Sequence, residues 1–392
     1  MAVDLANWSW NMGFMKRSDR WRLHRRIFHQ SFHSRIVSSY FPIQRAATLK
    51  FLQKLHTNPE EFYLHSRSHT GSIILQIVYG ISPDSEKVDE YFKLADDAIQ
   101  GISAVGVHGS YLVDYFPVLK HLPTWVPFTT FKKSAQVWGD YSDQLKDRPW
   151  GWVLESVATD KSSPEVSFCT ENLEKYNITP NSGSEMEDIV KNVAGIAFVG
   201  GTDTTVSAVL SFILAMVLFP DVQSRAQKEL DQMIGSGRLP DFADRDNLPY
   251  IEALILEVLR WNPAGPTAVA HHSINDDVYD GYFIPAGTAV IGNAWAILHD
   301  EELYGADPLS FKPERFLQVH RDDSKTAQPG PPDPKLFAFG FGRRICPGRY
   351  LALNTLYLTI TYVLSTFTIT KAVDEKGNDI TPEVDYMEGM IS

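Results

Sequence analysis

One cysteine, Cys346, lies in a stretch whose composition suits a thiolate ligand. Residues 339–348 read FGFGRRICPG, and an apolar helix is predicted directly after them. The preceding arginines and the backbone N–H groups of a helix start stabilise a deprotonated thiol, and the glycines let the backbone approach a flat, bulky group. A zinc ion needs four ligands, and the stretch holds no second cysteine or histidine. It therefore predicts a single axial ligand; the alternative is a glycine-rich turn around a structural cysteine.

A second pattern interrupts a long helical segment. Residues 186–219 have the periodicity of a helix, which Pro220 ends. In its middle, residues 200–205 read GGTDTT, and such residues are poor helix formers. Threonine hydroxyls can bond backbone carbonyls and open a local bulge. The alternative is a kink that only fits neighbouring helices, but burying Asp203 beside Thr204 is a costly choice for a kink alone.

Taken together, these patterns carry a resemblance. The pattern F-x-x-G-x-R-x-C-x-G, met by Phe339, Gly342, Arg344, Cys346 and Gly348, resembles the heme-binding loop of the cytochromes P450. In that family a cysteine thiolate binds the heme iron. The resemblance implies that Cys346 is the metal ligand of heme b, and that Phe339 and Gly348 lie against the cofactor.

The interrupted helix is similar to the family pattern [A/G]-G-x-[D/E]-T-[T/S]. The resemblance implies that Thr204 relays protons through its hydroxyl and that Asp203 supplies them, a form of general acid catalysis. Relatives that do not activate oxygen often lack this pair. Its presence favours a monooxygenase.

Further residues are implied to bind the heme propionates. Trp21 and Arg25 fit the W-x-x-x-R of the helix that lies beside the heme in the family. Arg344 is another candidate, because a guanidinium grips a carboxylate at two points. His271 is a third, at the family's usual interval before a hairpin over 281–288, although the adjacent His272 remains an alternative. Any of these residues could instead be a solvated surface group.

The predicted helix over 251–261 is apolar around most of its circumference. Glu257 and Arg260 are three residues apart and share a face, and buried charges must be paired. The segment Pro313–Phe316 resembles the family's second arginine element. The resemblance implies a structural triad of Glu257, Arg260 and Arg315.

The amino-acid composition limits the classes of fold and partner that are possible for this chain. The chain has 392 residues, 44% hydrophobic and 12% aromatic, and no linker separates independent blocks, so we expect a single domain over 1–392. The fold class is mainly α with a small β region, as in cytochrome P450. A net charge of −12 argues against nucleic acid as a partner. The two cysteines indicate no disulfide framework, and Cys169 has no assigned role.

The resemblance also sets expectations about membranes and chain ends. Family members normally carry a membrane anchor, a first helix and the first strands before the Trp21 helix, and a final strand pair after the point where this sequence stops at 387–392. We therefore expect a chain truncated at both ends. The family implies the cytoplasmic face of the endoplasmic reticulum. The longest apolar run, 206–219, is short for a span; a buried helix is favoured over the alternative of a non-enzymatic membrane protein.

The resulting expectation is a heme-thiolate monooxygenase that takes electrons from NADPH-cytochrome P450 reductase. The acidic surface of that reductase would meet the arginine-rich segment 16–26 and the arginines beside Cys346. Small or apolar residues of the distal wall indicate a small lipophilic substrate: Ala197, Phe198, Gly201 and residues 264–269. The alternative is a heme-less, inactive remnant of the family.

Overall fold

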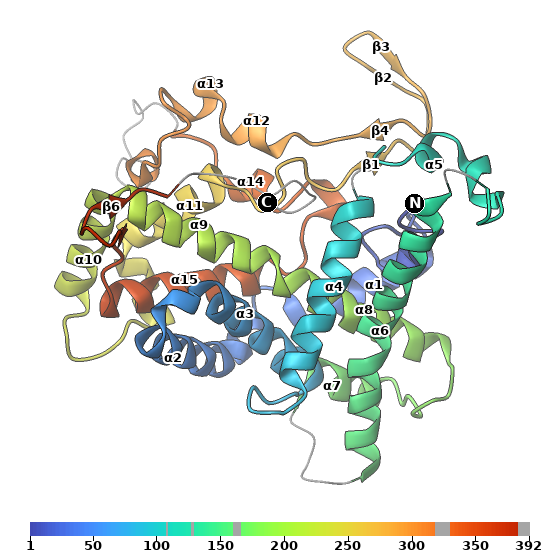
Figure 1. Cartoon of the computed structure of the whole chain (residues 1–392), viewed down its shortest axis with the longest axis horizontal. Coiled ribbons are helices and arrows are strands. Elements are labelled where there is room, and N and C mark those ends of the chain that lie inside the picture. Colours follow the sequence, from blue (N-terminus) through green and yellow to red (C-terminus); the bar gives the residue numbers. More distant parts are fainter. Residues whose placement is uncertain (107–108, 127–128, 160–165, 318–329, 383–392) are drawn as a thin grey trace. The chain divides into compact units, whose positions relative to one another are not determined.

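Helices make up most of the described chain. The computed structural model describes residues 1–106, 109–126, 129–159, 166–317 and 330–382 (Figure 1). Its backbone divides into two units, one of residues 1–206 with 347–355 and one of residues 207–346 with 356–392. Residues 387–392, after which the family resemblance implies a further strand pair, lie outside the described residues. The mainly α fold with a small β region is confirmed.

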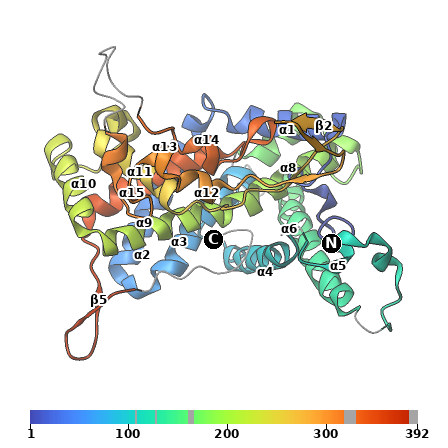
Figure 2. The ribbon, with the colours of Figure 1, turned by 90° about the horizontal axis from the view of Figure 1, so that it is seen from above.

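Unit 1 is a set of helices packed around α3. Its α-helices are α1 (Asp19–Phe32), α2 (Phe41–Thr57), α3 (Phe62–Tyr79), α4 (Val88–Gly106), α5 (Leu112–Tyr115), α6 (Thr130–Thr159), α7 (Phe168–Lys175) and α8 (Glu185–Thr202). Helix α3 contacts α2, α4, α7 and α8, because its second half is an almost continuous apolar run that is buried from Ile73 to Tyr79. Helices α4 and α6 lie side by side (Figures 1 and 2).

Unit 2 combines helices with three short antiparallel strand pairs. Its helices are α10 (Pro220–Met233), α11 (Pro249–Trp261), α12 (Ala294–Leu298), α13 (Glu301–Tyr304) and α14 (Lys335–Ala338), with 3-10 helices η5 (Phe242–Asn247), η6 (Pro313–Phe316) and η8 (Gly342–Arg344). Helices α9 (Thr204–Leu218) and α15 (Arg349–Thr366) each have their first residues in unit 1 and the rest in unit 2. The strand pairs are β1 (His271–His272) with β4 (Ala289–Val290), β2 (Asp277–Tyr279) with β3 (Tyr282–Ile284), and β5 (Ala372–Val373) with β6 (Asp379–Ile380).

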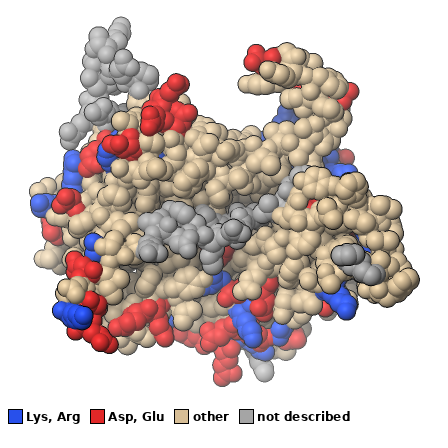
Figure 3. Space-filling view, turned by 45° about the horizontal axis from the view of Figure 1, so that its top comes forward, with Lys and Arg blue, Asp and Glu red and all other residues tan. Residues whose placement is uncertain are grey.

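A hairpin lies beside the expected range 281–288, but it spans 277–284, four residues earlier. Strands β2 and β3 pair with Tyr279 opposite Tyr282, so the turn is Asp280-Gly281. Both turn residues have positive φ, 49° and 82°, as a type I′ turn requires. The hairpin exposes Val278, Tyr279, Tyr282 and Phe283, and its surface is mainly uncharged in Figure 3.

The long helix is interrupted where the sequence predicts. Helix α8 ends at Thr202, α9 begins at Thr204, and Asp203 lies between them. Within the described residues, one helical segment, Glu185–Leu218, is long and apolar enough to cross a membrane, and half of its most apolar window is buried inside the protein. A core helix of a soluble protein meets the same criteria.

Candidate active site

The Cys346 loop has a tight backbone that depends on glycine. Gly340 and Gly342 have φ of 79° and 55°, a left-handed conformation that other residues adopt only with strain. The N–H of Cys346 donates to the carbonyl of Phe339 at 2.7 Å and closes the loop. Cys346 is partly buried and lies three residues before α15. The loop therefore fixes the position of its thiol through the backbone.

In unit 2, the structure brings two predicted propionate residues close together. His271 begins β1, opposite Val290, and is partly buried. Burial, and then the positive charge of Arg344, lower the pKa of His271, and burial also lowers the pKa of Arg344. His272, the alternative, is exposed on the same strand. Arg344 therefore provides the positive charge for an anionic group here, whereas the lowered pKa of His271 disfavours the charged form of its ring.

In unit 1, the other two predicted residues lie one turn apart on α1. Ser18 caps this helix by accepting the N–H of Trp21 at 3.1 Å. Trp21 is buried and Arg25 is partly buried on the same face. Ile27 and Phe28 are buried as well, so α1 packs on the rest of unit 1 along one side.

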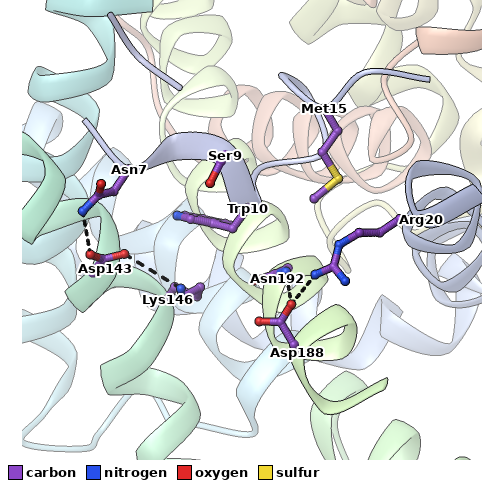
Figure 4. Close-up of a pocket in the computed structure, with 9 residues that line it drawn as sticks. All are labelled: Asn7, Ser9, Trp10, Met15, Arg20, Asp143, Lys146, Asp188 and Asn192. Carbon is purple, nitrogen blue, oxygen red and sulfur yellow. Dashed lines mark hydrogen bonds and ion pairs between the residues drawn. The ribbon is translucent and has the colours of Figure 1, made fainter. Parts of the chain in front are cut away.

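A polar cavity of about 370 Å³ lies beside the start of α1 (Figure 4). Arg20 reaches across it to Asp188 on α8, and Asp188 also accepts the amide N–H of Asn192 at 3.1 Å. On the other side Asn7 donates to Asp143 of α6 at 2.9 Å. These contacts tie α1, and with it Trp21 and Arg25, to the rest of unit 1.

At the break between α8 and α9, hydroxyl groups replace helical hydrogen bonds. The Thr204 hydroxyl donates to the carbonyl of Gly200 at 2.7 Å, as the sequence predicts for such a break. The Asp203 carboxylate, 17% exposed, lies 3.3 Å from a guanidinium nitrogen of Arg67 on α3. Burial raises the pKa of Asp203, and Arg67 opposes this by its charge and hydrogen bond.

Arg67 and its neighbour Thr70 are residues that the sequence analysis missed. Both lie on α3, more than 130 residues before the break. A contact over this separation leaves no spacing pattern in a single sequence, so only the packing of α3 on α8 reveals it.

Two predicted distal-wall residues are part of the core. Ala197 and Phe198 are buried, and the Phe198 ring meets Tyr79 edge-on with centroids 6.0 Å apart. Gly201 lies against Ile74, where an added Cβ would come within 2.5 Å of the Ile74 Cδ1. In unit 2, residues 264–269 are partly buried or exposed.

The predicted structural triad is confirmed by its geometry in unit 2. Arg260 donates to both carboxylate oxygens of Glu257 at 2.7 and 2.8 Å, and Arg315 Nε lies 3.6 Å from Glu257 Oε1. Burial raises the pKa of Glu257, and the hydrogen bonds and charges of its partners oppose this. Arg315 also donates to the carbonyls of Tyr304 and Asp307. The triad thereby joins α11 to the segment before η6.

The donor set fits a heme. Within unit 2, Cys346 offers one thiol for an iron, and Arg344 offers a cation for a propionate carboxylate. Among the residues that the structure describes, no three His, Cys, Asp or Glu side chains converge to hold a metal ion by themselves. A prosthetic group with one axial protein ligand matches these residues better than a bare metal ion.

Comparison with known proteins identifies the family of this chain. The family model described as "Cytochrome P450" matches residues 7–387. A cytochrome P450 monooxygenase of Armillaria gallica is 40% identical, over 100% of this chain and 75% of the relative. The cytochrome P450 monooxygenase COX2 of Coprinopsis cinerea is 41% identical, over 97% of this chain and 71% of the relative. A solved zebra fish cytochrome P450 with progesterone has the same fold, with a TM-score of 0.75 at 24% identity over 100% of this chain and 84% of that chain.

The fold and site thus define a heme-thiolate oxidoreductase that incorporates oxygen. The chain belongs to the cytochrome P450 family, and its curated relatives are fungal monooxygenases. Family membership gives it a heme iron, a small organic substrate and a redox partner.

Proposed function

We propose that this chain inserts one oxygen atom from O2 into a small lipophilic substrate, with heme b as cofactor and NADPH-cytochrome P450 reductase as electron donor. The observation that carries the proposal is the Cys346 loop, whose glycine conformations and Cys346-to-Phe339 hydrogen bond hold one thiol in a fixed place. When bound, the heme supplies the oxygen activation. The chain's own residues bind it, orient it and deliver protons.

The proposed binding roles follow the chemistry of each side chain. Cys346 is the iron ligand, and Phe339 and Gly348 flank it on either side in the sequence. Arg344 and His271 in unit 2 bind propionate, as do Trp21 and Arg25 in unit 1. The proximity of His271 to Arg344 supports their share of this role, because Arg344 supplies a positive charge and the imidazole of His271 can donate a hydrogen bond to the same anionic group.

The proposed catalytic pair is Asp203 and Thr204. The Thr204 hydroxyl has its proton directed to the Gly200 carbonyl at 2.7 Å, from which it can turn toward a ligand. Asp203 is only partly accessible and its pKa is raised by burial, which makes it a better proton donor than an unperturbed aspartate.

The proposed reductase contact involves α1. Arg22 and Arg26 are exposed, and Arg22 pairs with Asp19 on the same helix. Arg20 is instead held by Glu185 and Asp188 on α8. We expect Arg22→Glu and Arg26→Glu to slow electron transfer at low salt, and the effect to fade as salt rises. Lys376→Glu, on the exposed turn between β5 and β6, makes the same change in charge as a control. Unchanged rates for the α1 variants at low salt would contradict this contact.

The proposed location is the cytoplasmic face of the endoplasmic reticulum, following the family. Exposed apolar side chains of unit 1 support contact with a lipid surface: Leu112, Tyr115, Phe116, Val118 and Trp125. Flotation with neutral lipid vesicles tests this contact. We expect Phe116→Ser with Trp125→Ser to reduce flotation, and equal flotation of both proteins would oppose the proposal.

The central experiment is the absorption spectrum of the reduced protein with carbon monoxide, beside Cys346→Ala. We expect a strongly red-shifted Soret band that the substitution abolishes. Cys169→Ala is the matched control and should leave the band unchanged. If the purified chain takes up no heme, or if the band is indifferent to Cys346, the proposed function is wrong and the alternative of an inactive relative holds.

A further inference from the structure

Arg67 on α3 lies between two carboxylates. Its Nη1 is 3.3 Å from Asp203 Oδ1 at the helix break, and its Nη2 pairs with Asp96 Oδ1 on α4. Nη1 also donates to the hydroxyl of Tyr63 at 3.0 Å, and the guanidinium lies 5.7 Å from the centroid of that ring. The single positive charge of Arg67 is therefore shared between the carboxylates of Asp203 and Asp96.

The position of Arg67 is fixed by the register of α3 on α8. One turn further along α3, the Thr70 hydroxyl donates to the carbonyl of Thr202 at 3.1 Å and takes up a carbonyl freed by the break. Another turn on, Ile74 fills the space that the missing Cβ of Gly201 leaves. Residues at positions 67, 70 and 74 share one helix face. The contacts of this face fix the position of the helix break, so the packing of α3 on α8 sets the geometry of the Arg67–Asp203 pair.

The two carboxylates differ in exposure. Arg67 and Asp203 are 14% and 17% exposed, whereas Asp96 is 38% exposed. Asp203 keeps a raised pKa although Arg67 opposes the effect of burial. A charge shared with Asp96 stabilises the Asp203 carboxylate less than a dedicated partner would.

We propose that Arg67 is a positioning residue that sets the proton occupancy of Asp203, and that Asp96 competes with Asp203 for it. The proposal rests on the proposed role of Asp203 as proton supply. Because Asp96 is on α4, the position of α4 against α3 changes how readily Asp203 ionises. A shift of α4 that withdraws Asp96 leaves Arg67 to Asp203 and favours its ionised form. A shift that draws Arg67 toward Asp96 favours the protonated form.

The test is an infrared titration of the Asp203 carboxyl in the purified protein, with the band assigned by its loss in Asp203→Asn. We expect the titration midpoint to rise in Arg67→Met, because the cation is lost, and to fall in Asp96→Asn, because the competitor is lost. A change of about one pH unit corresponds to a tenfold change in the acid constant. Asp97→Asn, the next residue on α4, is the matched control and should not move the midpoint.

The conservative variant Arg67→Lys keeps the charge and should return the midpoint toward that of the parent protein. If Arg67→Met does not fold, Arg67→Lys and Asp96→Asn still decide the question, because Asp96 is partly exposed and its replacement leaves the core intact. Midpoints that stay at the parent value in both Arg67→Met and Asp96→Asn, or that move in the same direction, would overturn the proposal.

Coupled turnover separates this inference from the proposed function. We expect Asp203→Asn to form less product for each NADPH consumed. If it forms as much as the parent, the proton-supply role of Asp203 is wrong, whereas opposite shifts in the Arg67 and Asp96 variants would still establish the shared cation.

Discussion

Glu257 and Arg260 form a two-point ion pair with no exposure to solvent. Arg260 Nε donates to Oε2 at 2.7 Å and Nη2 donates to Oε1 at 2.8 Å. The remaining donors of Arg260 reach the carbonyls of Leu298, Pro308 and Ser310, and Glu257 also accepts the N–H of Lys312. Every member of the pair is thus satisfied, and the network joins α11 to the segment 298–312.

Removing one partner of this pair should be strongly destabilising. Arg260→Met leaves the Glu257 carboxylate buried with half of its partners, and breaking a buried pair costs about 3–5 kcal/mol. The control is Arg225→Gln on α10, which removes the exposed ion-pair partner of Glu314. It should lower the free energy of unfolding by less than about 1 kcal/mol. Urea denaturation of both variants measures the difference. Similar losses in the two variants would show that burial of the pair is not what matters.

The sequence predicted this pair because its two members share one helix turn. The same holds for the Cys346 loop and for the break at Asp203, where the constraint lies within a few consecutive residues. The contacts of Arg67 with Asp203 and of Arg20 with Asp188 join residues more than 130 positions apart. Long-range pairs depend on how helices pack, which no local pattern encodes.

The surroundings of other residues could not be predicted from the sequence. Phe198 was expected at a distal wall, yet its ring packs against Tyr79, because α3 covers that side of α8. Cys169 lies in a polar stretch of sequence but is fully buried, because α7 turns it toward the core. The direction in which a helix faces is set by its neighbours, and a short helix such as α7 carries too few residues for a periodic signal.

The two adjacent glycines at the end of α8 should respond oppositely to alanine. A Cβ at Gly200 meets nothing within 4 Å, so Gly200→Ala should stabilise the protein by about 0.5–1 kcal/mol through helix propensity. A Cβ at Gly201 would come within 2.5 Å of Ile74, and such overpacking costs about 1–3 kcal/mol. Thermal unfolding of the two variants tests this contrast.

A second substitution shows whether Ile74 is responsible. Ile74→Ala in the Gly201→Ala background should recover stability relative to the sum of the single changes, because the shortened side chain accepts the new methyl group. Strict additivity would place the clash elsewhere.

The two cysteines should differ in reactivity toward a thiol reagent. Burial raises the pKa of Cys169 well above its usual value, and that side chain is not exposed. Cys346 is partly exposed in its loop. Because the thiolate is the reactive form, iodoacetamide should modify Cys346 in the heme-free native protein and leave Cys169 intact. Mass spectrometry of the peptides reports the sites, and denaturant should make both react.

Heme loading should protect Cys346 from the same reagent, because an iron-bound sulfur is unavailable for alkylation. This readout does not depend on turnover. Equal modification of Cys346 with and without bound heme would mean that the cofactor is held by another residue.

The ionisation of Asp203 should make stability depend on pH. Its pKa is raised in the folded protein above the usual value of 3.8, so the folded state binds a proton more readily than the unfolded chain. Its contribution to stability is therefore fully present below a pH of about 4 and is lost as the pH rises through the folded-state pKa. Asp203→Asn removes this dependence, because an amide does not titrate.

The difference in unfolding free energy between the parent and Asp203→Asn, measured in urea at a series of pH values, isolates this effect from other titrating groups. We expect the parent to lose stability relative to Asp203→Asn as the pH rises from about 4, and the difference to level off above the folded-state pKa. The Arg67→Lys variant should lose stability with rising pH in the same way, because the positive charge beside Asp203 remains. A parent that gains stability relative to Asp203→Asn over this range would mean that Arg67 outweighs burial and holds Asp203 fully ionised.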